Sequence, residues 1–272
     1  MVHGDAKRLR TAELSNWTGK ALAAPRSEME SLLAREEAAK SGVYFLTGND
    51  PETGKSTVYV GEAESIGDRL RGHLGKDYWN QVVFFISKDE NLTKGLVRYL
   101  EGRLIDQIKS AGRAVLQNAQ GSGSRLPESD REEMEVFLEK IHQLMPVLGT
   151  DALVPVGSIS SGQAEKRTLF CEIKGLKATG HLTPTGFVVL RGSQAVLKER
   201  ASAGQYPHAI APRRRLVEDG TLVQDGAHYV FHRDAEFTSP SAAATVVHGG
   251  SANGLLAWKT KDGKTLKDLE AA

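Results

Sequence analysis

Residues 42–61 read GVYFLTGNDPETGKSTVYVG, and this stretch decides the fold of the first half of the chain. It holds two short runs rich in β-branched and aromatic residues, 43–46 and 57–60, which favour strands. Between them lies a segment dense in glycine, asparagine, aspartate and proline, the residues that form turns. The stretch therefore predicts a β-hairpin that brings Tyr44 and Tyr59 side by side.

A first amphipathic helix is predicted over residues 63–74. Its apolar residues recur every four positions and would form one buried stripe. Arg69 and His73 are also four residues apart, so their side chains should project together beside that stripe. The members of the stripe are Ile66, Leu70 and Leu74.

A second amphipathic helix is predicted over residues 92–110, and it carries a carboxylate on its apolar side. Glu101 should be at least half buried there. Burying an unpaired charge costs several kcal/mol, so we expect a cation, a set of hydrogen-bond donors or a metal ion beside it. An ion pair with Arg98 or Arg103 is the structural alternative.

The order of these features resembles the GIY-YIG nuclease family over about residues 40–120. The triplets 42–44 and 59–61 match the family signature with valine in place of isoleucine, a swap of one β-branched residue for another. The family places an arginine eight residues after the second triplet, and Arg69 stands at that position. The family also has an asparagine after the second helix, which Asn118 matches. The resemblance implies a catalytic set of Tyr44, Tyr59, Arg69, His73, Glu101 and Asn118.

The resemblance also implies a mechanism. Glu101 and water molecules would bind Mg²⁺ or Mn²⁺, since hard cations prefer oxygen ligands. Arg69 would hold the non-bridging phosphate oxygens. Tyr44 is the favoured general base and Tyr59 would position the water or the phosphate, although the two roles could be exchanged. His73 would assist proton transfer, and Asn118 would order the site.

Residues 53–57 look like the end of a phosphate-binding loop, but the match is incomplete. Asn49 stands where that motif requires its first glycine. Such a loop must also lead into a helix, whose N-terminus receives the phosphate, and here the chain continues as a strand. We therefore expect no nucleotide cofactor.

Composition limits the class of protein. A chain of 272 residues with 40% hydrophobic residues favours two domains. Its single cysteine, Cys171, excludes an intrachain disulfide and a cysteine-cluster zinc site, which suits a reducing compartment. The sequence has no apolar run long enough to cross a bilayer, so we expect a cytoplasmic protein with no membrane partner. The oligomeric state stays open.

The predicted fold class is α+β, with a small antiparallel sheet flanked by helices and a second small α+β domain. Residues 1–40 are predicted to be an N-terminal extension, and 41–148 the nuclease-like domain. An acidic helix at 128–145 should pack its apolar face inward and point away from phosphate. A glycine- and serine-rich linker is predicted over 149–165, and the second domain over 166–272.

The second domain is the basic part of the chain, with 15 basic and 10 acidic residues. Strands are predicted at 168–173, 178–182, 186–190 and 229–232, and helices at 211–219 and from Ser239. Three arginines in one turn of the first helix, Arg213, Arg214 and Arg215, could neutralise several phosphates or form a solvated face.

Segments of the second domain, 237–243 and 251–259, resemble a small domain of unknown role that is often fused behind GIY-YIG domains. They are also similar to domains associated with restriction enzymes and adenine methylases. The resemblance implies nucleic-acid recognition, with DNA as the partner.

The sequence as a whole favours a metal-dependent DNA endonuclease that hydrolyses phosphodiester bonds in repair, restriction and defence, or mobile-element biology. Two alternatives remain open at this point. One is a non-catalytic DNA-binding protein, and the other is a protein-interaction module that uses the acidic helix at 128–145. The sequence does not reveal which DNA sequence, structure or modification would be preferred.

Overall fold

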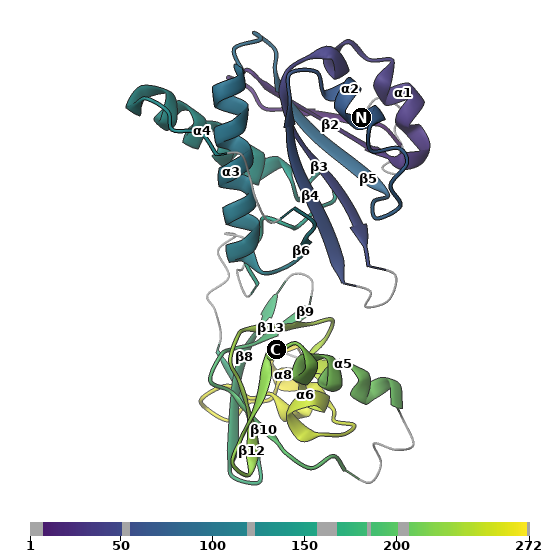
Figure 1. The fold of residues 1–272 in the computed structure, drawn as a ribbon. Helices are drawn as coiled ribbons and strands as arrows, with labels where there is room; N and C mark the ends of the chain where they lie inside the picture. The colour runs from purple at the N-terminus through teal and green to yellow at the C-terminus, as the bar shows by residue number, and fades with distance from the viewer. Residues whose placement is uncertain are drawn as a thin grey trace. The chain divides into compact units, whose positions relative to one another are not determined.

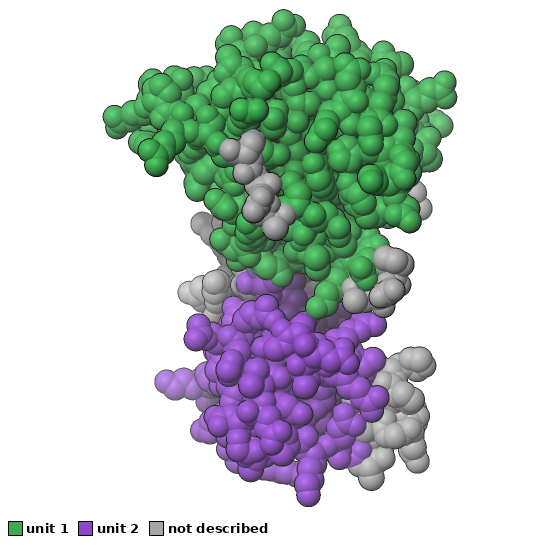
Figure 2. Space-filling view, viewed as in Figure 1, with its two compact units in different colours: residues 1–155 green, residues 156–272 purple. Residues whose placement is uncertain are grey.

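The computed structural model describes residues 8–50, 55–118, 123–156, 168–183, 186–200 and 207–270. The chain divides into unit 1, residues 1–155, and unit 2, residues 156–272 (Figures 1 and 2). The division falls within the range predicted as a linker, 149–165, but the first part of that range belongs to unit 1, where Ala152 and Leu153 are buried in the core. Both units contain helices and sheets, as the α+β prediction requires. Within the described ranges, no helix is both long enough and apolar enough to span a membrane.

Unit 1 is built on one six-stranded sheet with the strand order β1-β2-β5-β3-β4-β6. Neighbouring strands are antiparallel except β4 and β6, which pair in parallel. The strands are β1 (Arg10–Glu13), β2 (Gly19–Pro25), β3 (Gly42–Asn49), β4 (Ser56–Ala63), β5 (Gln81–Ser87) and β6 (Val115–Leu116).

The predicted hairpin is confirmed as β3 and β4. Tyr44 pairs with Gly61, and Leu46 pairs with Tyr59. Because side chains alternate along a strand, both tyrosines lie on the same face of the sheet.

Helices and apolar cores cover both faces of this sheet. On one face, Phe45 and Val60 pack against α3 (Lys94–Ala111) and α4 (Glu128–Leu144), both predicted from their apolar periodicity. On the other face, Tyr44 packs with residues of α1 (Met29–Leu33) and α2 (Ile66–Arg71). Figure 1 shows α3 on one side of the sheet and α1 and α2 on the other.

The first predicted helix is shorter than its apolar spacing suggested. Ser65 caps α2 by accepting a hydrogen bond from the backbone N–H of Asp68, and the helix ends before Gly72. Leu74 therefore lies beyond the helix and is 40% exposed, so its place in the buried stripe was predicted wrongly.

Residues 8–40 are an integral part of unit 1 and not an extension of it. Strand β2 pairs with β5 along its whole length, and Ala21 to Ala24 are fully buried. After β2 the chain forms three short helical pieces: η1 (Arg26–Glu28), α1, and η2 (Glu36–Ala39). Arg35 takes an extended conformation between them, and the buried Glu37 contacts Arg35 and Lys20 at 2.7 and 2.8 Å.

Unit 2 combines a four-stranded sheet of order β13-β9-β8-β7 with a three-stranded sheet of order β10-β12-β11. Cys171, Phe187 and Trp258 lie in its core. The strands are β7 (Leu169–Ile173), β8 (Leu176–Thr183), β9 (Gly186–Val189), β10 (Gln194–Val196), β11 (Leu222–Asp225), β12 (His228–Phe231) and β13 (Ala235–Phe237). The helices are α5 (Pro207–Glu218), α6 (Pro240–His248), α7 (Gly254–Ala257) and α8 (Leu266–Glu270).

The start and end of α6 follow the sequence signals. The Ser239 hydroxyl accepts a hydrogen bond from the Ala242 N–H at 3.1 Å, and Pro240 occupies the first turn. Gly249 ends the helix in the left-handed conformation, at φ 62°, which glycine adopts without a steric penalty.

Candidate active site

The two signature tyrosines stack against each other on one face of the unit 1 sheet. Their ring centroids are 6.0 Å apart and the ring planes differ by 26°. Gly61, opposite Tyr44, leaves the room that this ring needs, because a Cβ atom at position 61 would lie 2.3 Å from Tyr44 Cζ. The glycine of the second triplet is therefore a packing requirement of the tyrosine in the first.

Helix α2 and the turn after it bring two nitrogen-bearing side chains to the Tyr44 hydroxyl. Arg69 Nε donates a hydrogen bond to Tyr44 Oη at 3.3 Å, and His73 Nε2 lies 3.0 Å from the same oxygen. The prediction that Arg69 and His73 project together is confirmed.

Tyr78 is a member of the site that the sequence did not reveal. Its hydroxyl is 3.0 Å from His73 Nδ1, so the imidazole is held by a tyrosine at each ring nitrogen. The indole N–H of Trp79 donates to the His73 carbonyl at 3.1 Å and fixes the backbone as well. We call Tyr44, Tyr59, Arg69, His73 and Tyr78 the tyrosine cluster.

Burial sets the protonation states in the tyrosine cluster. The Tyr44 side chain is fully buried, and this burial, reinforced by the nearby Tyr59, raises the pKa of the Tyr44 hydroxyl even though Arg69 acts in the opposite direction. Burial, with the charges of Arg69 and Lys76, lowers the pKa of His73. At neutral pH, Tyr44 is a phenol and His73 a neutral imidazole, which has one donor and one acceptor for its two tyrosine partners.

The members of the tyrosine cluster differ in exposure. Tyr44 is 0% exposed, whereas Tyr59 is partly exposed and Arg69 is exposed. Contact with the Tyr44 hydroxyl raises the pKa of Arg69, so the guanidinium is charged at any physiological pH. A substrate arriving from solvent would meet Arg69 and Tyr59, with Tyr44 behind them.

Glu101 lies on α3, which packs against the face of the sheet opposite to that of the tyrosine cluster. It is 8% exposed on α3, so the prediction of burial is confirmed. One turn earlier on α3, Arg98 Nε is 3.7 Å from the carboxylate of Glu62 on β4, directly after Gly61. The other predicted ion-pair candidate, Arg103, binds Glu135 through Nε and Nη2 at 2.6 and 2.8 Å.

Asn118 holds the edge of β4. Its amide accepts a hydrogen bond from the Val60 N–H at 3.1 Å and donates one to the Val60 carbonyl at 2.6 Å. A side chain that satisfies both backbone groups of one residue acts as an extra strand residue. Since Val60 lies between Tyr59 and Gly61, Asn118 fixes the strand that carries the second tyrosine.

The structure thus brings Tyr44, Tyr59, Arg69 and His73 into contact with one another, and places Asn118 against Val60, next to Tyr59 on β4. Across the described ranges, no group of three or more His, Cys, Asp or Glu side chains is arranged to hold a metal ion. Glu101 offers one hard oxygen donor, the kind of ligand that Mg²⁺ and Mn²⁺ prefer.

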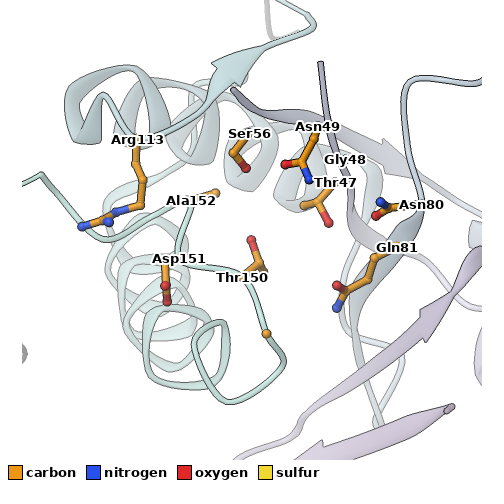
Figure 3. Close-up of a pocket in the computed structure, with 11 residues that line it drawn as sticks. Thr47, Gly48, Asn49, Ser56, Asn80, Gln81, Arg113, Thr150, Asp151 and Ala152 are labelled. Atoms are coloured by element: carbon orange, nitrogen blue, oxygen red, sulfur yellow. The ribbon is translucent and has the colours of Figure 1, made fainter. Parts of the chain in front are cut away.

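A polar pocket of about 380 Å³ lies in unit 1, and none of the described residues that line it belongs to the tyrosine cluster. Figure 3 shows the side chains of Ser56, Gln81 and Thr150, from three different segments, around this pocket. Arg113 at its rim donates through Nε to the Val154 carbonyl at 2.8 Å. Among the described residues that line the pocket, none is a predicted site residue.

The arginines of α5 do not behave as a unit, which corrects the prediction that all three face phosphate. Arg213 is 3% exposed; its guanidinium donates to the carbonyls of Val196, Leu197 and Val246. Arg214 and Arg215 are exposed. A helix turns 100° per residue, so three consecutive side chains cannot share a face.

Comparison with known proteins identifies one part of the chain. Residues 169–270 match a family model described as a domain of unknown function, DUF4357. The match lies within unit 2, in agreement with the predicted C-terminal domain of unknown role, and leaves unit 1 outside it. No curated protein and no solved structure matches the chain.

Proposed function

We propose that unit 1 is a metal-dependent DNA endonuclease of the GIY-YIG type, which hydrolyses phosphodiester bonds. The observation that carries the proposal is the convergence of Arg69 and His73 on the hydroxyl of Tyr44, next to the stacked Tyr59. The spacing of these residues in the sequence and their contacts in space agree, although they come from β3, β4 and the α2 region.

Arg69 binds the scissile phosphate in this proposal. Its guanidinium is exposed and charged, and the Tyr44 hydroxyl fixes its Nε. A planar guanidinium held in this way can present its remaining N–H groups to the non-bridging oxygens. Preorganised donors of this kind stabilise the charge that develops on the phosphate in the transition state.

Tyr59 takes the contact with the attacking water, which exchanges the two roles given to the tyrosines from the sequence. Tyr44 is fully buried and its pKa is raised, so it is poorly suited to take a proton from water. As the water oxygen bonds to phosphorus, the ester P–O bond breaks, and the proton that the water loses passes through the Tyr59 hydroxyl to solvent. The departing ester oxygen then takes up a proton.

His73, Tyr44 and Tyr78 form the support of the site. Neutral His73 accepts from one tyrosine and donates to the other, which locks its ring beside Tyr59 at a centroid distance of 4.9 Å. The buried network holds Arg69 and Tyr59 in place, so that little reorganisation is needed when substrate binds.

Glu101 would hold the metal ion together with water molecules and a phosphate oxygen. When bound, Mg²⁺ or Mn²⁺ supplies polarisation of the scissile phosphate and stabilises the negative charge on the leaving oxygen.

Cleavage of supercoiled plasmid, modified and unmodified, tests the proposal. The intact chain should nick or linearise plasmid with Mg²⁺ or Mn²⁺ but not with EDTA, and Glu101→Gln should lose this activity while still binding DNA. Glu139→Gln, which removes the same charge from an exposed site on α4, should cleave normally. Equal cleavage by the Glu101→Gln chain, or binding without cleavage of any plasmid, would contradict the assignment and favour a non-catalytic DNA-binding protein.

A further inference from the structure

Unit 2 carries a basic groove of about 400 Å³ whose residues the sequence did not single out. It lies between the ends of two hairpins, β7–β8 and β11–β12, and the chain segment after β10. Leu176, Val196 and Leu197 give it apolar walls, and Lys174, Lys198 and His228 supply its nitrogen atoms. Among the described residues that line the basic groove, none is acidic.

Lys174 occupies a backbone conformation that does not suit a lysine. It sits at φ 51° in the two-residue turn between β7 and β8, followed by Gly175 at φ 78°. Turns with two positive φ angles strongly prefer asparagine, aspartate or glycine at the first position. Lys174 is also exposed, so burial in the core does not account for a lysine at this strained position.

On the opposite side of the basic groove, two hydrogen bonds link Gln194 to Lys177 and to His228. The Gln194 amide accepts from the Lys177 N–H at 3.2 Å and donates to His228 Nε2 at 3.1 Å. His228 Nε2 is therefore the acceptor, and a neutral ring carries its proton on Nδ1. The imidazole is held in one orientation and has a remaining N–H donor.

A buried positive charge lies directly behind the apolar wall of the basic groove. Arg213 donates to the carbonyl oxygens of Val196 and Leu197, and its guanidinium stacks at 5.0 Å over Tyr229, the neighbour of His228. All the hydrogen bonds described for Arg213 go to backbone carbonyls. In the low dielectric of the interior its field is weakly screened, so it adds to the positive potential of the groove.

We propose that the basic groove binds the phosphate backbone of DNA and holds unit 2 on the substrate that unit 1 cleaves, an inference that rests on the proposed nuclease function. Lys174, Lys198 and the His228 N–H would contact phosphate oxygens, and the apolar walls would take the sugar. Such contacts position a protein on DNA without reading bases. We therefore expect unit 2 to bind many DNA sequences through this groove.

The test compares DNA binding by Lys174→Ala/Lys198→Ala with binding by a matched control, Lys264→Ala/Lys267→Ala, which removes two exposed lysines elsewhere in unit 2. Fluorescence anisotropy of a labelled DNA duplex, in EDTA and over a range of salt concentrations, gives Kd and its salt dependence. Loss of two phosphate contacts should weaken binding on the order of 10-fold or more and make the slope of log K against log salt shallower by about 2. The control should stay within about threefold of wild type, the range expected for distant surface charges.

Equal binding by wild type and the groove variant, or equal loss in the groove variant and the control, would overturn the proposal. Plasmid cleavage at saturating DNA is measured in parallel. Cleavage under these conditions reports on unit 1 alone. If the wild-type chain does not cleave plasmid but the groove variant still binds DNA more weakly, the nuclease proposal is wrong and the groove remains a DNA-binding site.

Discussion

Arg69 in unit 1 and Arg213 in unit 2 looked alike in the sequence, since both were predicted to contact phosphate from a short helix. In the structure, Arg69 is exposed, and its guanidinium donates to the Tyr44 hydroxyl. Arg213 is 3% exposed, and backbone carbonyls of three residues accept from it. One guanidinium can meet a ligand directly, and the other joins α5 to the segments around β10 and α6.

The difference shows that the hydrogen-bond partners and the exposure of an arginine decide whether it stabilises the fold or can bind a ligand. A guanidinium whose donors are taken up by carbonyl oxygens stabilises the fold, because removing it leaves several buried acceptors unsatisfied. A guanidinium fixed at one nitrogen and open to solvent costs little to remove but can bind an anion. Variants at the two kinds of arginine should therefore differ in whether they lose stability or activity.

The largest effect on stability is expected from Arg213→Ala. The change leaves buried carbonyls without a donor and creates a cavity over Tyr229, so we expect a loss of about 3–5 kcal/mol in the free energy of unfolding of unit 2. Urea denaturation measures it. Arg215→Ala, two residues along and exposed, should change stability by less than about 0.5 kcal/mol. Similar losses of stability in the two variants would contradict the structural role of Arg213.

Unit 1 has its own buried structural charge, Glu37. Arg35, followed by Lys20, lowers the pKa of this carboxyl to about 2 from its ordinary 4.5. The stabilisation is present above pH 4.5 and is lost as the pH falls toward 2, and it amounts to about 2–3 kcal/mol. Glu37→Gln should remove it at neutral pH and flatten the acid limb of a stability–pH curve between pH 4.5 and 2. An unchanged acid limb would contradict the assignment.

Gly61→Ala tests how Arg69 is held in place, because it disturbs Tyr44, whose hydroxyl accepts a hydrogen bond from this arginine. The added methyl group must displace the buried ring of Tyr44, at a cost of about 1–3 kcal/mol. Since Tyr44 holds Arg69 and His73, cleavage should fall much more than stability. Gly75→Ala, where an added Cβ would meet nothing within 4 Å, is the control. Thermal unfolding and plasmid nicking by both variants give the result.

The smallest effect is expected from the histidines. Burial lowers the pKa of His142 and, together with nearby cations, the pKa values of His73 and His248. The unfolded chain therefore binds more protons than the folded one, and stability should decline as the pH falls below about 6.5. His73→Gln should make the decline of Tm between pH 7.5 and 5.5 shallower, whereas a steeper decline would contradict burial of the neutral form.

Local sequence patterns were enough for the parts of the fold that local forces decide. The β3–β4 hairpin follows from its turn and its β-branched runs, and α3 from its apolar period. The i, i+4 spacing of Arg69 and His73 correctly placed both side chains together. These features survive in the structure because tertiary packing reinforces them.

The parts that the sequence did not predict depend on distant contacts. Strand β2, with the sequence GKALAAP, has no β-branched residue and becomes a strand by pairing with β5. Tyr78 joins the site from a loop, where no periodicity marks it. Arg213 could not be distinguished from Arg214 because the buried face of α5 is set by the carbonyl groups that it meets.

The most direct test of the account is the rate of plasmid nicking by Arg69→Ala in Mg²⁺, beside wild type and Arg215→Ala. Loss of a preorganised donor to the scissile phosphate should slow nicking by about 10²–10³-fold, with unfolding unchanged and Arg215→Ala close to wild type. Nicking by Arg69→Ala at the wild-type rate would contradict the claim that the tyrosine cluster is an active site.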